Sequence, residues 1–246
     1  MEQFLFSAPG EYYVQHVRRC LERLELLYPI FKTTLRRVCG FEDHEYLRKM
    51  IIFHDLGKLT KRWQEGVNRR VKLPSHATVG AAYLWRSLPT GVREPVSFAV
   101  AIHHTDKGLL GDNIESPDVR AILDNIVDIE GKIEWHDKVE ELDKNLFPED
   151  AKNLSVDDLK MMARNLRAWA RGEDFLTQHW RRLQVTLVHH LLKLCDVSAA
   201  TTRQEHEEEA DEEHYYGGWL MVENIKNYVE RISARRRFWE KMMERG

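Results

Sequence analysis

The chain has 246 residues, of which 43% are hydrophobic and 31% charged, a composition typical of one globular domain over residues 1–246 and not of a disordered chain. The formal net charge is -3, but residues 205–213 hold seven acids, so the remainder is net positive and does not repel an acidic substrate. No apolar run approaches the roughly 18 to 20 residues that span a bilayer and residues 1–4 lack a basic leader, so we expect a cytoplasmic protein without a membrane partner.

Apolar residues at spacings of three and four predict helices along most of the chain. The first covers residues 11–27 and is expected to end at Tyr28-Pro29, because the residue before a proline disfavours the helical conformation. Turn residues separate the next helical patterns. Those patterns cover residues 42–56, 76–88, 96–104 and 119–129.

The second half of the chain predicts three more helices. The sequence Ser155-Val156-Asp157-Asp158 is typical of a capping box that opens a helix through Ala170. A helix over residues 177–200 follows, with Trp180, Leu183 and Leu187 on one apolar face. An acidic loop at 203–214 then leads to a basic C-terminal helix at 219–244. The sole β element suggested is a short hairpin between Val67 and Leu73, so the fold class is all-α with a core over about 11–200.

Cysteine and histidine usage bears on metal binding. Cys20, Cys39 and Cys195 lie far apart and lack Cys-x-x-Cys spacing, which predicts reduced, buried thiols instead of disulfides or a thiolate zinc site. The 12 histidines are more unusual, because neutral imidazole is a common metal ligand at pH 7. Their grouping therefore decides whether a metal site is present.

The pair His54-Asp55 stands where an apolar helical pattern runs into Gly57. Neighbouring side chains on a helix diverge by about 100°. Both can therefore serve one metal centre only if it lies at the helix end or if the carboxylate bridges two ions. The alternative is a surface histidine beside a capping aspartate.

Other histidines and one aspartate also stand in apolar helical surroundings. His103-His104 ends the apolar pattern 96–102, where two imidazoles are costly unless satisfied by hydrogen bonds or by a metal. Asp196 interrupts an apolar stretch, and His16 and His76 lie in or at the start of helices. Together they form a donor set suited to divalent ions, the alternative being separately hydrogen-bonded core groups.

The histidines and aspartates named above form a pattern along the chain: His16, His54-Asp55, His76, His103-His104 and Asp196. Together with Gly57-Lys58, Trp63-Gln64 and Ser198, this pattern resembles the HD nuclease of type I CRISPR interference, within the HD superfamily of metal-dependent phosphohydrolases. The resemblance runs from about residue 16 to residue 200. Trp63 replaces the more usual Phe, and Thr105 stands where Gly is common. The resemblance implies an HD-domain helical bundle with a metal site between its central helices.

The resemblance further implies two metal ions. One is held by His16, His54, Asp55 and Asp196, and the other by Asp55, His76, His103 and His104. Imidazole-rich sets favour the transition metals Mn, Fe, Co, Ni and Zn, with Mg as the less favoured choice.

Asp55 and Lys58 are the expected catalytic residues. Asp55 bridges the two ions, and Lys58 offers a positive charge to the scissile phosphate unless it is a solvated surface lysine. Basic residues that follow the motif are expected to guide a phosphate chain to the site. They are Arg62, Arg69, Arg70 and Lys72.

The resulting hypothesis is a metal-dependent endo- or exonuclease acting on single-stranded DNA in CRISPR antiviral defence. The family implies two partners, a superfamily 2 helicase and the RNA-guided surveillance complex, Cascade. A separate short chain is one form in which this nuclease occurs. The alternatives are an HD-family nucleotidase or dNTP phosphohydrolase, and a non-catalytic docking module stabilised by its metal.

Overall fold

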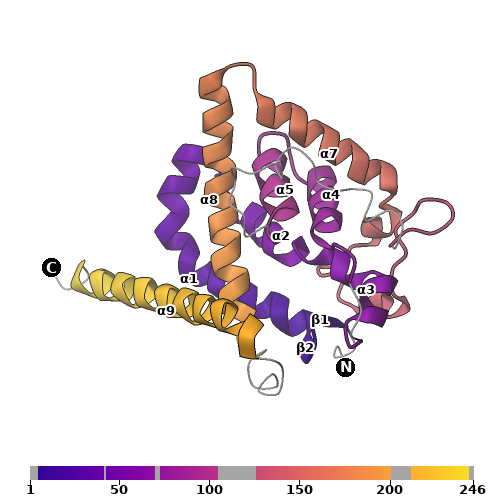
Figure 1. Cartoon of the computed structure of the whole chain (residues 1–246). Helices are drawn as coiled ribbons and strands as arrows, with labels where there is room; N and C mark the ends of the chain where they lie inside the picture. Colours follow the sequence, from indigo (N-terminus) through magenta and orange to yellow (C-terminus); the bar gives the residue numbers. More distant parts are fainter. Residues whose placement is uncertain (1–4, 42, 70–72, 105–125, 201–211, 244–246) are drawn as a thin grey trace.

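The computed structural model describes residues 5–41, 43–69, 73–104, 126–200 and 212–243, most of them helical (Figure 1). The longer helices are α1 (Tyr13–Cys39), α2 (Glu45–Phe53), α3 (Lys61–Gly66), α4 (Ala77–Ser87), α5 (Arg93–Ala101), α7 (Val156–Arg171), α8 (Phe175–Ala199) and α9 (Glu212–Met243). Short 3-10 helices are η1 (Leu56–Leu59), η3 (Asp137–Glu141) and η4 (Glu149–Asn153). Strands β1 (Phe6–Ala8) and β2 (Glu11–Tyr12) form an antiparallel hairpin. The predicted all-α class is confirmed.

Two long helices, α1 and α8, pack against each other, and shorter helices lie beside them in the centre of the molecule. Figure 1 shows α1 and α8 side by side, with α2, α4 and α5 in the middle and α9 crossing one end of α8. One continuous hydrophobic core joins them, with fully buried residues from α1 (Leu24, Leu27), α2 (Met50) and α8 (Leu191, Leu192). Helices that are distant in sequence are thereby held at fixed positions around a common centre.

Helix α1 does not end at Tyr28-Pro29 as predicted but continues through Pro29 to Cys39. An interior proline costs a helix about 3 kcal/mol. Here Pro29 lies on the exposed face. The opposite face keeps its apolar stripe, because Leu27 and Leu35 are both fully buried. Burying each such leucine contributes about 1.5 to 3 kcal/mol, enough to offset the proline. The helix ends at Gly40, whose φ of 69° lies in the left-handed region.

Short-range sequence patterns predicted the starts of α7 and α8 to within two residues. The predicted capping box is present: Asp158 N–H donates to Ser155 Oγ, and Ser155 N–H donates to Asp158 Oδ2 at 2.9 Å. Helix α8 begins two residues before the predicted start, where Asp174 Oδ1 accepts from Thr177 N–H. Its predicted apolar face is only partly buried, since Trp180 and Leu183 are 49% and 46% exposed.

Three predicted segments fall wholly or partly outside the described residues. The predicted hairpin is one: residues 67–69 form a turn, 73–76 are irregular, and 70–72 are not described. Most of the predicted helix 119–129 and most of the acidic loop 203–214 are not described either, although α9 starts at Glu212 inside that loop. Within the described part of the chain, no helix is long and apolar enough to cross a membrane.

Candidate metal centre

The break after α2 explains how His54 and Asp55 face one centre. The helix ends at Phe53, His54 keeps helical angles, and Asp55 leaves them with φ of -101° and ψ of 12°. The site therefore lies at a helix end, one of the two arrangements that the 100° divergence of adjacent helical side chains allows. Gly57 allows the next segment to approach, because a Cβ there would lie 2.3 Å from the carbonyl oxygen of His76.

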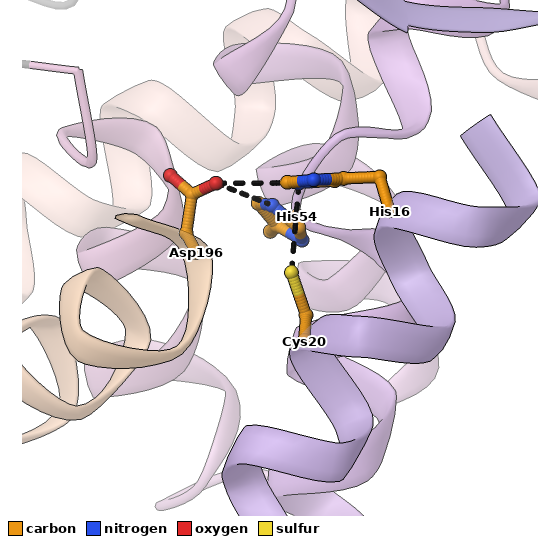
Figure 2. A group of neighbouring side chains, drawn as sticks. All are labelled: His16, Cys20, His54 and Asp196. Carbon is orange, nitrogen blue, oxygen red and sulfur yellow. Dashed lines mark hydrogen bonds and ion pairs between the residues drawn. The ribbon is translucent and has the colours of Figure 1, made fainter. Parts of the chain in front are cut away.

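A first group of side chains gathers from α1, the end of α2 and α8 (Figure 2). His16 Nε2 lies 3.2 Å from Asp196 Oδ1 and 3.4 Å from Asp55 Oδ2. His54 Nε2 lies 3.4 Å from Asp55 Oδ2 and 3.8 Å from Asp196 Oδ1. Cys20, which the sequence did not suggest as a ligand, joins this group with its Sγ 3.5 Å from His16 Nε2.

A second group shares Asp55 and lies on its other oxygen. His76 Nε2 is 3.1 Å and His103 Nε2 is 3.6 Å from Asp55 Oδ1. His104 Nε2 lies 2.6 Å from His76 Nε2. Their ligand atoms, one from each residue, all lie within 4.8 Å of one another. Each Asp55 oxygen thus faces a different set, and all seven predicted metal ligands come together in one cluster.

The imidazole nitrogens are oriented as metal ligands require. Nδ1 of His54 donates to Ile51 O at 2.7 Å, and Nδ1 of His103 donates to Val100 O at 2.6 Å. With the proton on Nδ1, each Nε2 presents a lone pair. Both Nε2 atoms are buried without a hydrogen-bond partner among the described residues. Lone pairs facing carboxylate oxygens are costly unless a cation lies between them, so this donor set fits divalent metal ions.

The charges of the cluster agree with metal binding. Burial raises the pKa of Asp55, but His54, Lys58 and other basic neighbours outweigh it and hold that pKa well below its ordinary value. Burial lowers the pKa of His76 to about 4, which keeps this imidazole neutral. Ionised carboxylates and neutral imidazoles are the protonation states that bind metals.

His16 is held by a further carboxylate that the sequence analysis missed. Its Nδ1 donates to Glu11 Oε1 at 3.2 Å, and Glu11 also accepts from Ser7 Oγ at 2.7 Å. Burial disfavours a charged His16, yet Cys20, Asp196 and Asp55 raise its pKa well above the ordinary value. The pocket around His16 therefore favours positive charge. A carboxylate behind a ligating histidine fixes its ring and raises its basicity.

Lys58 is buried, so the alternative of a solvated surface lysine is wrong. It is 3% exposed, and its Nζ lies 2.6 Å from Asp55 Oδ2. Trp63 packs beside it, with the ammonium 5.7 Å from the ring centroid, and meets His76 edge-on. Gln64 ties the N-terminal hairpin to this segment, because its Nε2 donates to both Phe6 O and Lys58 O. Trp63 and Gln64 thus fix the segment that carries Lys58 against the N-terminal hairpin, which carries Glu11.

The expected nucleic-acid contacts are only partly described. Arg62 and Arg69 are exposed on α3 and just after it, whereas Arg70 and Lys72 lie outside the described residues. Neither described arginine belongs to the metal-ligand groups. The two groups differ in access: the first is largely buried, whereas His104 of the second is exposed. The second group is therefore the side from which solvent reaches the cluster.

Of the residues that the sequence analysis missed, Cys20 carried a usable signal. It stands four residues after His16 and hence on the same face of a helix. Glu11 carried none, because it precedes the helix and meets His16 only through the hairpin.

Comparisons with known proteins bear on the family and the fold of the chain. The family model described as HD domain matches residues 13–201. The CRISPR-associated endonuclease Cas3-HD of Thermoproteus tenax is 28% identical over 191 residues, covering 75% of this chain and 82% of the relative. Among solved structures, the CRISPR-associated Cas3 HD domain protein of Methanocaldococcus jannaschii matches with a TM-score of 0.59 at 18% identity, covering 78% of this chain and 100% of that one. At that identity the structural match establishes the fold.

Proposed function

The chain belongs to the HD domain family, and on that premise we propose that it is a metal-dependent nuclease that hydrolyses phosphodiester bonds of single-stranded DNA in CRISPR interference. The observation that carries the proposal is Asp55, whose two oxygens face two separate groups of ligands. The Thermoproteus tenax relative is named a CRISPR-associated endonuclease, which supports the reaction class. A superfamily 2 helicase and the surveillance complex Cascade are the proposed partners, and the cytoplasm is the proposed location.

Each set of ligands would hold one of two metal ions. His16, His54, Asp55 and Asp196 would hold one ion, and Asp55, His76, His103 and His104 the other. Two divalent ions held there would supply an activated water and would neutralise charge on the attacking and leaving oxygens of a phosphodiester. No side chain is then needed as nucleophile.

The surrounding residues keep these ligands in place. Carbonyl oxygens hold the rings of His54 and His103 by their Nδ1 protons, and Glu11 does the same for His16. Lys58 balances the charge of Asp55. The exposed side chain of His104 leaves the second group accessible, which supports catalysis over a closed structural site.

Substrate access supports a strand over a mononucleotide. Helix α3 follows η1, the segment that carries Lys58, and exposes Arg62, with Arg69 exposed just after it. Helix α3 meets the second ligand group through Trp63, whose ring contacts His76, so exposed cations on this segment would suit the phosphates that flank a scissile bond. Both arginines are therefore proposed contacts for the DNA backbone.

The test is an incubation of purified, metal-free protein with circular single-stranded DNA, linear single strands, duplex DNA and a panel of nucleotides. Mn²⁺, Co²⁺, Ni²⁺, Zn²⁺ and Mg²⁺ are added in turn, with a chelator as control. We expect single strands to be cut, and cutting of the circle identifies an endonuclease. Hydrolysis of nucleotides without strand cleavage would favour the nucleotidase. Bound metal without hydrolysis of any substrate would favour the docking module.

A further inference from the structure

A sulfur atom lies among the ligands of the first group. Cys20 stands one helical turn after His16 on α1 and is fully buried. Its Sγ is 3.5 Å from His16 Nε2, and its neighbours in the group are His54 and Asp196 (Figure 2). Nitrogen, oxygen and sulfur donors from three helices thus point at one spot.

We propose that Cys20 is a thiolate ligand of the ion held by His16, His54, Asp55 and Asp196, and that this half of the centre selects Zn²⁺, Co²⁺, Ni²⁺ or Fe²⁺ over Mg²⁺. The inference rests on the metal centre of the proposed function and is independent of its substrate. When the metal–sulfur bond forms, the thiol loses its proton to solvent. Soft sulfur favours these ions, whereas Mg²⁺ prefers oxygen ligands.

The spacing of the donors fits a shared ion. Metal–nitrogen bonds of about 2.0 to 2.1 Å and a metal–sulfur bond of about 2.3 Å place the two donors between about 3.1 Å apart at a right angle and about 3.6 Å apart at the tetrahedral angle, so Asp55 can remain a further ligand. The observed separation of His16 Nε2 and Cys20 Sγ is 3.5 Å. A thiol donating a hydrogen bond to His16 would give a similar distance, so a second observation is needed.

That second observation is His54. Its Nε2 belongs to the same group as Cys20 Sγ, is buried, and has no hydrogen-bond partner among the described residues. A hydrogen bond between Cys20 and His16 leaves this nitrogen unsatisfied. An ion in this group satisfies the His54 nitrogen, and Cys20 Sγ lies within 4.8 Å of the ligand atoms of His54 and Asp196, close enough to bind the same ion.

The chain supplies its own control cysteines. Cys195 is fully buried and precedes Asp196 on α8, and Cys39 is buried at the far end of α1, with its Sγ near Gln184 O. Neither belongs to a metal-ligand group within the described residues. Burial alone is common to all three, so only the position of Cys20 distinguishes it.

The experiment is a titration of metal-free protein with Co²⁺, followed by near-ultraviolet absorption. We expect a sulfur-to-cobalt charge-transfer band in the wild type and in Cys39→Ser and Cys195→Ser, and its loss in Cys20→Ser. The affinity of Cys20→Ser for Zn²⁺ should fall by at least the roughly 10- to 100-fold that follows loss of an outer-shell partner. Its affinity for Mg²⁺ should change little.

Other outcomes overturn the proposal. Co²⁺ bound without such a band refutes the thiolate ligand and leaves the proposed nuclease intact. Failure of any ion to bind refutes both. A band that survives in Cys20→Ser and disappears in Cys195→Ser would identify Cys195 as the sulfur ligand and refute the proposal for Cys20. If Cys20→Ser does not fold, X-ray absorption of the wild type with Zn²⁺ decides, since a ligating sulfur scatters at about 2.3 Å.

Discussion

Replacing Lys58 by methionine tests how the charge of Asp55 is balanced. The two side chains are 4% and 1% exposed and form an ion pair of 2.6 Å. At that distance the attraction is about 6 kcal/mol for an effective dielectric constant near 20. Removing one partner of a buried pair costs about 3 to 5 kcal/mol, because the other charge remains buried. We expect the free energy of unfolding of the metal-free protein to fall by about that amount.

Added metal should restore much of this loss, because ions bound at Asp55 also neutralise its carboxylate. The assay is urea unfolding of wild type and Lys58→Met, each with and without Mn²⁺ or Zn²⁺. Lys61→Met is the matched control: its ion pair with Glu134 is nearly as short, 2.8 Å, but exposed, so the loss should be much smaller. The reasoning is refuted if metal-free Lys58→Met unfolds like the wild type, or if metal stabilises both proteins equally.

Four further changes test the centre and its substrate. Asp55→Ala should abolish hydrolysis and lower bound metal, measured by elemental analysis and a phosphodiester assay; a folded variant that keeps both contradicts the shared ligand. Glu11→Gln should weaken metal binding by about 10- to 100-fold in calorimetric titration with little change in helicity, and unchanged affinity argues against its role behind His16. Gly57→Ala places a Cβ 2.3 Å from a backbone carbonyl oxygen, so unfolding should show a loss of about 1 to 3 kcal/mol and reduced metal content. If Gly57→Ala is as stable as the wild type, the backbone at His76 shifts enough to accommodate the added Cβ. For metal-free protein, the logarithm of affinity for single-stranded DNA should fall with the logarithm of salt at about 0.7 per contacted phosphate, and Arg62→Glu with Arg69→Glu should flatten the slope. A slope near one phosphate at every oligonucleotide length favours the nucleotidase.

Much of the centre could be predicted from sequence because its signals are local. An imidazole or carboxylate within an apolar helical pattern is costly wherever the helix packs, so His103 and Asp196 stood out without knowledge of the fold. The capping box at Ser155 and Asp158 depends on residues three apart, and the structure contains it. Helix periodicity likewise predicted an all-α protein.

Other features depend on contacts between distant segments. Helix α1 passes through Pro29 because Leu35 packs into a core that the helix alone does not contain. Lys58 is buried because Asp55 and Trp63 surround it, whereas its own sequence neighbours leave a surface position equally acceptable. Tertiary packing therefore decided both the end of the helix and the environment of the lysine.

The sequence supplied the ligand residues, and the family resemblance implied their two sets, but the contacts that bring each set together are made by the tertiary structure. Asp55 turns one oxygen to His16 and the other to His76 because the helix breaks between His54 and Asp55. Glu11 reaches His16 through a hairpin, and Cys20 enters the group only because α8 brings Asp196 beside α1. Side-chain direction at a helix break and the approach of remote helices are set by packing, which periodicity along one chain does not encode.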